Sequence, residues 1–499
     1  MTSAYSKYRE RMTKIADISH AIGVLSWDKE TYLPVKSDRF RSQQIATLSA
    51  MSHGEFTSPE FGDIIQNALA VKRLKAAERR NLTITLDHYQ KAKKFDEAFV
   101  IEQSMAISKA FQLWVQAKKT GDFGLYAPAL DDLIRLKIKE SKILNFGDHP
   151  YDALLDQYEP NSTVAQLDKL FVDVRDELLP LIEKIREAKK PSVKFMHKTY
   201  KKDKQWDFGI YLLRVMGYDF DMGRQDISSH PFTISFSPED VRVTTRIDDN
   251  DLANMTWSCL HEGGHALYEQ GLNPEEYGLP SGGAISLAIH ESQSRLWENH
   301  VGRSRDFWQC NYPSLQSKFK KNLKNVSLKD FYKAINKVEP NLIRTEADEL
   351  HYHLHVLIRY EIEKEILSGN CDAATARELW NKKYKDYLGL KVKNDTVGIL
   401  QDVHWSHGSF GYFPTYSMGS FYAAQFYQQA QKDMPDLNEQ IAISNNYPLL
   451  QWLRTKIHCH GRSFEAEELC KKLTGEPLNL KYFIQYVKEK YGDLYNIDL

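Results

Sequence analysis

Two histidines four residues apart, with a glutamate directly after the first, carry the clearest chemistry in this chain. His261, Glu262 and His265 form the pattern H-E-x-x-H. Residues four apart on an α-helix lie on the same face, so the two imidazoles can bind one metal ion. Glu262 projects from the same turn, where it can accept a proton from a water molecule at the metal. The pattern therefore predicts a hydrolytic metal centre; the alternative is two surface histidines on an ordinary helix.

The flanking sequence places this motif in the middle of a helix. The acidic stretch 248–251 offers N-caps, and Gly271 is typical of a C-cap. Between them, apolar residues recur at helical spacing: Leu252, Met255, Leu260 and Leu267. Gly263 and Gly264 are unusual here, since each costs about 1 kcal/mol relative to Ala inside a helix. We expect another part of the chain to approach this helix too closely to leave room for side chains.

A catalytic zinc ion needs a third protein ligand. A loop rich in Gly and Pro covers residues 271–283, and a second helical pattern follows it. Glu291, near the start of that pattern, is the first candidate for the third ligand, and Glu298 is its rival. Three other glutamates are less favoured because they end the first helix or lie in its loop: Glu269, Glu275 and Glu276.

HEGGH followed by HESQ resembles the carboxypeptidase Taq family of metallocarboxypeptidases (peptidase family M32). Other segments resemble motifs of the same family, in order along the chain: WDKETYLP (27–34, with Leu33 in place of Met), YDALLDQYEP (151–160), HPF (230–232), DVRVT (240–244), IRTEAD (343–348) and GILQDVHW (398–405). The family often has Gly where this chain has Asn161, and both residues tolerate positive φ. The resemblance favours Glu291 as the third ligand.

The resemblance also implies an architecture, a cofactor and a substrate class. The expected fold is mainly α: a large helical body with a deep active-site cleft and a small β-ribbon beside the metal helix, like the gluzincins neurolysin and ACE. Residues 1–499 would form one catalytic domain, divisible into two helical lobes that flank the cleft. Each chain would bind one divalent metal ion, zinc by default, although cobalt suits the same ligands. The expected enzyme is a homodimeric metallocarboxypeptidase that releases C-terminal amino acids one at a time with broad specificity.

A segment rich in Gly and aromatic residues follows the last motif, at 404–416. Helical zinc peptidases of this general fold place His and Tyr donors in a similar stretch, where they stabilise the tetrahedral oxyanion. We expect His407 and Tyr416 to act in catalysis, and His404 and Tyr412 to contact the substrate. A packing role is the alternative for Tyr412.

For exopeptidase action, a cation must bind the free C-terminal carboxylate. Arg suits this task because its planar guanidinium matches a carboxylate in a bidentate manner. Arg344, in IRTEAD, is the first choice, and Arg242, in DVRVT, is the second. The alternative for each is a structural salt bridge.

The expected reaction is metal-assisted peptide hydrolysis. The metal would polarise the scissile carbonyl and acidify a water molecule. Glu262 would accept the proton of that water and deliver it to the leaving amine. An oligopeptidase or peptidyl-dipeptidase on the same helical scaffold is the alternative activity. A binding protein without activity and a purely structural scaffold are further alternatives, disfavoured by the intact metal motif.

The remaining histidine clusters are weaker candidates. Of His351, His353 and His355, only the first and last share a helical face, and no glutamate follows either of them in the catalytic position. His458 and His460 lack a partner cluster. We expect the first group to lie on a helix surface or a cleft wall, and we interpret the second group as structural.

Most of the chain has helical patterns, and one segment does not. Helices are expected over 76–119, 164–189, 328–337, 346–367 and 374–388. In 230–247, apolar and polar residues alternate on both sides of the turn 237–240, which predicts a β-hairpin directly before the metal helix. An exposed edge of this hairpin could hold a peptide by main-chain hydrogen bonds.

Composition limits the remaining functions. The 66 basic and 67 acidic side chains give a net charge of −1, which argues against a nucleic-acid or membrane-surface role. The N-terminal residues lack an apolar signal sequence, and no apolar run is long enough to span a membrane. Five cysteines without a close pair fit free thiols in a reducing compartment. We therefore expect a cytoplasmic enzyme.

Overall fold

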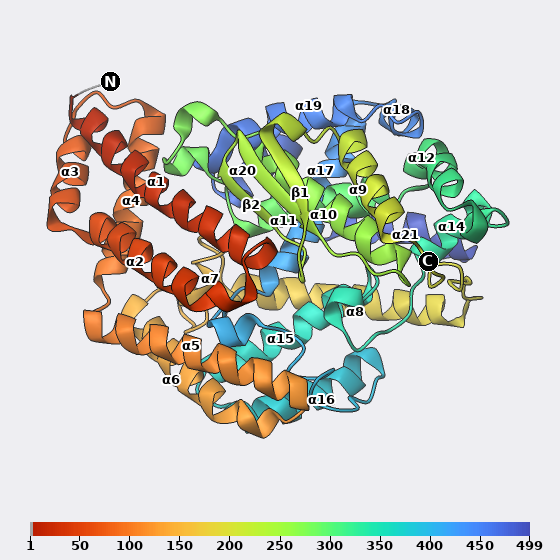
Figure 1. Cartoon of the computed structure of the whole chain (residues 1–499), viewed down its shortest axis with the longest axis horizontal. Coiled ribbons are helices and arrows are strands. Elements are labelled where there is room, and N and C mark those ends of the chain that lie inside the picture. Colours follow the sequence, from red (N-terminus) through yellow and green to blue (C-terminus); the bar gives the residue numbers. More distant parts are fainter. Residues whose placement is uncertain (1–2) are drawn as a thin grey trace. The chain divides into compact units, whose positions relative to one another are not determined.

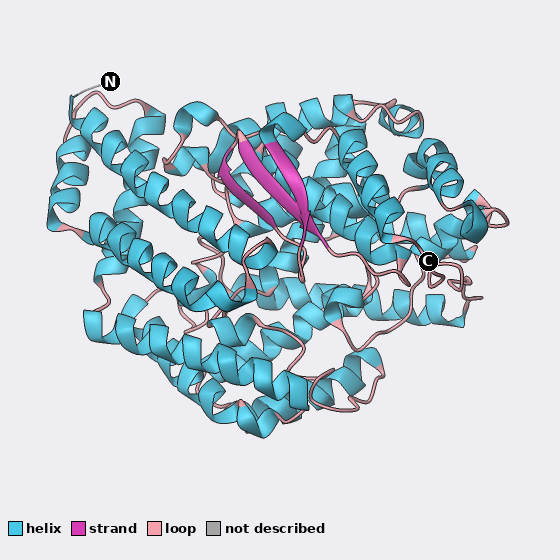
Figure 2. Ribbon diagram, in the orientation of Figure 1, coloured by secondary structure: helices cyan, strands magenta, loops and turns pink. Residues whose placement is uncertain are grey.

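The computed structural model describes residues 3–499, which are mainly helical with one small β-sheet (Figure 2). The expectation of a mainly α fold with a small β-ribbon is confirmed. The chain divides into two compact units, each assembled from three segments. The first unit comprises the described parts of Met1–Lys93, Ser192–Ile335 and Tyr422–Leu478; the second comprises Lys94–Pro191, Asn336–Phe421 and Asn479–Leu499. The expected single domain with two lobes stays a prediction.

Helices make up most of the first unit (Figure 1). They are α1 (Ser3–Thr31), α2 (Asp38–Thr57), α3 (Pro59–Leu69), α4 (Ala76–Lys93), α9 (Lys202–Met216), α10 (Leu252–Glu269), α11 (Leu287–Arg295), α12 (Arg305–Lys318), α13 (Lys320–Leu323), α14 (Leu328–Ile335), α18 (Leu437–Ala442), α19 (Tyr447–Lys456) and α20 (Ala466–Thr474). A π-helical segment, Leu296–Gly302, continues α11.

The long elements of the second unit are also helices. They are α5 (Glu97–Thr120), α6 (Ala127–Leu144), α7 (Asp152–Leu155), α8 (Val164–Glu187), α15 (His351–Leu367), α16 (Ala373–Leu388) and α21 (Lys481–Tyr495). Helix α17 (Pro414–Asp433) contains the boundary between the two units.

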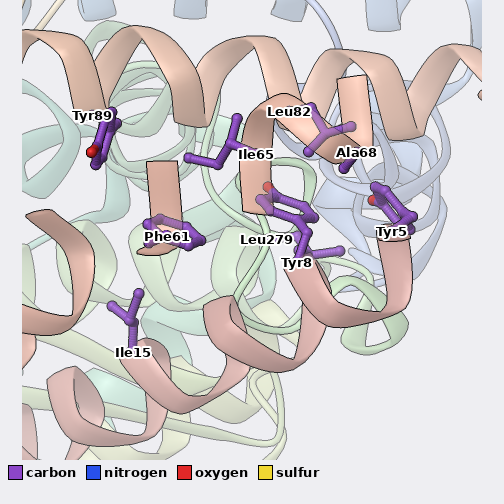
Figure 3. Packing of buried hydrophobic residues seen from close by; sticks show 9 residues of the cluster. All are labelled: Tyr5, Tyr8, Ile15, Phe61, Ile65, Ala68, Leu82, Tyr89 and Leu279. Carbon is purple, nitrogen blue, oxygen red and sulfur yellow. The ribbon is translucent and has the colours of Figure 1, made fainter. Parts of the chain in front are cut away.

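The N-terminal helices of the first unit form a core from residues at helical spacing. Phe61, Ile65 and Ala68 lie on one face of α3 because they are four and three residues apart. They pack against Tyr8 of α1, whose ring stacks on that of Phe61 with centroids 6.4 Å apart (Figure 3). The buried Tyr8 hydroxyl is satisfied by the Oγ1 of Thr85 at 2.8 Å. The core is therefore closed without leaving that polar group unpaired.

The predicted hairpin is present and belongs to a three-stranded sheet. Strand β2 (Thr233–Ser237) pairs antiparallel with β3 (Asp240–Thr245). Strand β1 (Gly223–Ile227) pairs with β3 in parallel, in the order β1-β3-β2. Strand β1 was not predicted, because its residues GRQDI lack the apolar alternation of an independent strand. Strand β2 is at the edge of the sheet and contacts α10.

Most predicted helices are present, with three corrections. The stretch 76–119 is two helices, α4 and α5, separated at Lys94–Asp96, where Asp96 accepts a hydrogen bond from the amide of Phe99 and starts α5. Helix α15 begins at His351 and not at 346, and a 3-10 turn, Arg344–Glu346, precedes it. Gly271 is not the C-cap of α10, because this helix ends at Glu269 and Gln270 is its C-cap. A Cβ on Gly271 would clash with the imidazole of His458.

Three smaller findings bear on the sequence analysis. Asn161 has φ 65°, the positive value that the comparison with Gly anticipated. All five cysteines are free. Among residues 3–499, no helix combines the length and the apolar character required to cross a membrane.

Candidate metal centre

Helix α10 holds the two histidines of the motif. Asp251 caps its start, since its side chain accepts a hydrogen bond from the amide of Ala253 at 2.9 Å. Met255 and Leu260 are fully buried and fix the orientation of the helix. His261 and His265 therefore lie in mid-helix on one face, half-buried, with ring centroids 4.9 Å apart.

The two glycines of α10 allow two other helices to approach it. A Cβ on Gly263 would lie 2.8 Å from the Leu213 side chain of α9. A Cβ on Gly264 would lie 2.5 Å from the Cα of Ser294 and 2.7 Å from the carbonyl oxygen of Gln293, both on α11. The expected close approach is confirmed, and its main consequence is that the backbone of α11 lies directly against the motif.

This close packing brings Glu291 of α11 to the two histidines. One ligand atom from each of His261, His265 and Glu291 lies within 4.8 Å of the other two. The Oε2 of Glu291 is 3.8 Å from the Nε2 of His261 and 3.5 Å from the Nε2 of His265. These separations exceed an ordinary hydrogen bond of about 2.9 Å. The three predicted ligand residues are thus brought together, with their donor atoms facing one another.

Arg295 holds Glu291 from the other side. Its Nε lies 2.6 Å from the Oε1 of Glu291, which leaves Oε2 directed toward the histidines. Burial alone would raise the pKa of Glu291, but the Arg295 guanidinium and the two imidazoles outweigh it and lower the pKa. The carboxylate is therefore ionised, as a metal ligand must be.

Glu298, the rival third ligand, has a different position. Its Oε2 is 2.9 Å from the Nδ1 of His261, on the side of the ring away from Glu291. Arg295 and Arg303 neutralise it, at 3.2 and 3.0 Å. Glu298 thus orients the His261 ring, leaving Nε2 to face Glu291.

His265 is oriented by another histidine. Its Nδ1 lies 2.6 Å from the Nδ1 of His290, and the Nε2 of His290 lies 2.8 Å from the Oε1 of Glu269. Burial and the neighbouring His290 lower the pKa of His265 to about 3. His265 is therefore a neutral imidazole, the form that binds metals.

The donor set fits a catalytic zinc centre. Two imidazole nitrogens and one carboxylate are a standard ligand set for an ion that keeps a coordination position open. Both imidazoles have their second nitrogen hydrogen-bonded, as histidine ligands of metals usually do. In residues 3–499, His261, His265 and Glu291 are the one group of His, Cys, Asp and Glu with metal-binding spacing.

Glu262 is buried beside the cluster and is held by the edge strand β2. The Oγ1 of Thr233 donates a hydrogen bond to the Oε2 of Glu262 at 2.7 Å. Burial raises the pKa of Glu262, and the bond from Thr233 opposes this only in part. A carboxylate with a raised pKa is a better proton acceptor near neutral pH.

Arg344, the first choice for binding the C-terminal carboxylate, is buried in the second unit in an ion pair. Its Nε and Nη2 are each 3.0 Å from the Oδ1 of Asp402, and its Nη1 is 3.0 Å from the hydroxyl of Tyr352. Arg359 binds the other oxygen of Asp402 at 2.6 Å. Two guanidinium groups share one carboxylate, so these three side chains carry a net charge of +1 (2 − 1).

Arg242, the second choice, is in the first unit on strand β3. It forms a bidentate pair with Asp240, with Nε and Nη2 at 2.9 and 2.8 Å from the two carboxylate oxygens. Its guanidinium also lies over the ring of Trp27, 4.4 Å from the centroid. Arg242 and Asp240 pair one to one, so the pair carries no net charge.

The four candidates of segment 404–416 all lie in the second unit, but in different surroundings. The Nε2 of His404 is 3.0 Å from the hydroxyl of Tyr416. Burial, together with the positive charge of Arg344, lowers the pKa of His404 to about 3. The Tyr412 ring packs 5.2 Å from that of Tyr416, and His407 is exposed, with its ring 4.9 Å from that of Phe111. His404, Tyr412 and Tyr416 therefore form one aromatic group.

The secondary histidine clusters have ordinary hydrogen-bond partners. His351 binds Asp348 at 2.6 Å, and the Nδ1 of His355 binds the hydroxyl of Tyr384 at 2.9 Å. His458 binds Gln293 at 3.0 Å. His351, His353 and His355 are all buried, so they do not lie on an exposed helix surface.

Sequence reasoning missed the roles of the side chains around the ligands: Glu269, His290, Arg295 and Arg303. The sequence held one clue, since His290 directly precedes Glu291 in HESQ. Their contacts depend on how α11 packs on α10, which no local pattern reveals.

The chain is similar to known metallopeptidases over nearly its full length. A family model described as carboxypeptidase Taq (M32) metallopeptidase matches residues 7–491. Carboxypeptidase 1 of Bacillus subtilis is 38% identical over 493 residues, covering 98% of each chain. Thermostable carboxypeptidase 1 of Thermus thermophilus is 37% identical over 512 residues, covering 99% of each. The crystal structure of an M32 carboxypeptidase from Deinococcus radiodurans has a TM-score of 0.97 at 34% identity, covering 99% of this chain and 100% of that one.

These similarities confirm the resemblance inferred from the motifs. The chain belongs to the carboxypeptidase Taq (M32) family of metallopeptidases and is a metallocarboxypeptidase, a hydrolase of peptide bonds.

Proposed function

We propose that this member of the M32 family removes C-terminal amino acids from peptides one at a time, with broad specificity, using one divalent metal ion held by His261, His265 and Glu291. The observation that carries the proposal is the convergence of the three donor atoms within 4.8 Å, next to the buried carboxylate of Glu262. Zinc is the proposed ion, and cobalt is compatible with the same donors. An ion bound there would polarise the scissile carbonyl and acidify a water molecule.

Glu262 is the proposed general base. Thr233 fixes one oxygen of its carboxylate, which directs the other toward a proton to be removed. The raised pKa of Glu262 makes its carboxylate a better proton acceptor for the attacking water. The same side chain can therefore take the proton from the water and deliver it to the amine.

Arg344 is the proposed reader of the substrate carboxylate. Asp402 orients its guanidinium, and the net charge of +1 on Arg344, Arg359 and Asp402 leaves the group attractive to one further anion. We propose that Tyr416 and His407 act in catalysis and that His404 and Tyr412 contact the substrate. Arg242, paired with Asp240, is the second candidate for the carboxylate.

Metal analysis and product analysis together test the proposal. Purified protein should contain about one zinc ion per chain, and Glu291→Ala should lose it. With a peptide blocked at its N-terminus, wild-type protein should release single amino acids from a free C-terminus and should act poorly on the C-terminally amidated form. Retention of tightly bound metal by Glu291→Ala would refute the ligand assignment. Release of dipeptides would instead support the peptidyl-dipeptidase alternative.

Sedimentation analysis would test the homodimer that the family resemblance implies.

A further inference from the structure

Glu269 and His290 form a hydrogen-bonded chain that ends on a proposed metal ligand. Glu269 ends α10, two turns after Glu262, and His290 lies on α11. The chain runs from the carboxylate of Glu269 to the Nε2 of His290 (2.8 Å) and from the Nδ1 of His290 to the Nδ1 of His265 (2.6 Å). Both side chains are mostly buried, with 17% of Glu269 and 20% of His290 exposed.

The carboxylate of Glu269 fixes the direction of the first bond in the chain. Burial alone would raise the pKa of Glu269, but the bonds from His290 and from the Ser235 side chain lower it, so its carboxylate is ionised and can only accept. The Nε2 of His290 therefore donates. A metal ion on the Nε2 of His265 requires the His265 proton on Nδ1, and the Nδ1 of His290, 2.6 Å away, is placed to accept it.

The consequence for His265 is a defined tautomer. With its proton on Nδ1, its lone pair is on Nε2, the atom that faces Glu291 at 3.5 Å. The opposite direction would place the proton on Nε2 and block that atom as a ligand. His261 reaches the same state by a shorter route, since Glu298 accepts from its Nδ1 directly.

We propose that Glu269 and His290 are a positioning pair, which fixes His265 as an Nε2 metal ligand and so sets the affinity of the centre for its metal. This inference rests on the proposed function, because it requires His265 to be a ligand. Glu269 and His290 act through His265, so neither has to touch the metal or the substrate.

The test compares metal affinities and does not depend on activity. Zinc dissociation constants are measured by chelator competition for wild type, Glu269→Gln, His290→Ala and His290→Asn. Glu269→Gln keeps the size of the side chain but replaces a group that can only accept with an amide that can either accept or donate, so the direction of the bond to His290 is no longer fixed. We expect both Glu269→Gln and His290→Ala to bind zinc about 10–100-fold more weakly. His290→Asn should lie between His290→Ala and wild type, because its amide oxygen can still accept from the Nδ1–H of His265.

Two controls separate positioning from a general loss of structure. His53→Ala removes an exposed histidine of α2, in the same unit as the metal centre, and it should bind zinc like wild type. The metal-free variants should melt at the temperature of metal-free wild type. In cobalt-loaded protein, the visible absorption of Co²⁺ should change in Glu269→Gln and stay unchanged in His53→Ala.

The outcomes distinguish this inference from the proposed function. Unchanged zinc affinity and an unchanged cobalt spectrum in Glu269→Gln and His290→Ala, with a wild type that binds zinc tightly, would refute the positioning pair alone. A wild type that binds no divalent metal would refute the proposed function and the pair with it.

Discussion

Glu262 and Glu269 lie on one face of α10, two turns apart, yet their surroundings suit them to different tasks. Glu262 receives a hydrogen bond from Thr233, and burial raises its pKa. Glu269 is bound by His290, which helps to lower its pKa. A carboxylate that holds protons more readily can act as a base, whereas one that stays ionised can orient a neighbour. The H-E-x-x-H spacing predicted the first role; the second depends on contacts that the sequence does not display.

The assignment of Glu262 as the general base predicts the effect of replacing its carboxylate with an amide. Glu262→Gln keeps the size and the bond from Thr233, but an amide cannot accept the proton of the attacking water. We expect kcat to fall by about 10²–10⁴-fold. Zinc content and melting temperature should match wild type, because Glu262 is not a proposed ligand. A variant that retains nearly full turnover would end the assignment.

The assignment of Arg344 predicts a selective loss. Arg344→Ala should reduce kcat/KM for peptides with a free C-terminus by a factor that corresponds to about 2–5 kcal/mol, because a desolvated carboxylate would lose its partner. Amidated peptides should remain poor substrates of both proteins. Arg242→Ala tests the second candidate in the same assay, and we expect it to leave the ratio between free and amidated peptides unchanged because Asp240 already pairs with its guanidinium. An unchanged ratio between free and amidated peptides in Arg344→Ala would transfer the role to Arg242.

Among the elements, α10 and α11 show where sequence reasoning succeeded and where it stopped. The Gly263–Gly264 pair correctly indicated a close neighbour, because two adjacent glycines inside a helix have a cost that packing must offset. It did not identify the neighbours as α9 and α11. The hairpin of β2 and β3 was predictable because its pairing is local, whereas β1 pairs with β3 in parallel across a longer stretch of chain.

The contact at Gly264 predicts that a single methyl group disrupts the metal centre. Gly264→Ala would place its Cβ 2.5 Å from the Ser294 Cα, so the α11 backbone must move. We expect a loss of about 1–3 kcal/mol in unfolding free energy, seen as a lower melting temperature of the metal-free protein. Zinc affinity should also fall, because Glu291 moves with α11.

Gly54→Ala is the matched control for this substitution. Gly54 lies inside α2, and apart from its two chain neighbours and the nearby backbone of its own helix, no heavy atom of a described residue lies within 4 Å of the position that its Cβ would take. The variant should gain about 0.5–1 kcal/mol of stability and keep its zinc affinity. Equal melting temperatures and equal zinc affinities of Gly264→Ala and Gly54→Ala would contradict the argument from close packing.

At the scale of the whole molecule, the motifs are distributed between the two units. WDKETYLP, HPF, DVRVT, HEGGH and HESQ belong to the first unit, whereas YDALLDQYEP, IRTEAD and GILQDVHW belong to the second. Each unit is assembled from three separate segments, which depends on long-range packing and has no local pattern in the sequence. The motifs of the second unit nevertheless meet one another: Tyr151 of YDALLDQYEP and Trp405 of GILQDVHW both bind Glu363 of α15, at 2.8 and 2.7 Å.

Glu363 predicts a specific pH dependence of global stability. Burial raises its pKa from 4.5 to about 7, although Tyr151, Trp405 and the amide of Gly411 donate to it. A raised folded-state pKa means that the folded protein holds this proton more tightly than the unfolded chain. The stabilisation is complete below pH 4.5 and is lost as the pH rises to about 7. The loss corresponds to roughly 3 kcal/mol for this one carboxyl group.

The comparison of two variants isolates this carboxyl from the other acidic groups. Glu363→Gln cannot ionise, so its melting temperature should decline less than that of wild type between pH 4.5 and 7, and the two profiles should run parallel above that range. Glu102→Gln, which removes a carboxylate paired with Arg135 at the surface, should follow wild type throughout. Parallel profiles of wild type and Glu363→Gln across the whole range would show that Glu363 is already ionised at pH 4.5. In that case its three hydrogen bonds outweigh burial, and the carboxylate anchors Tyr151 and Trp405 as an anion.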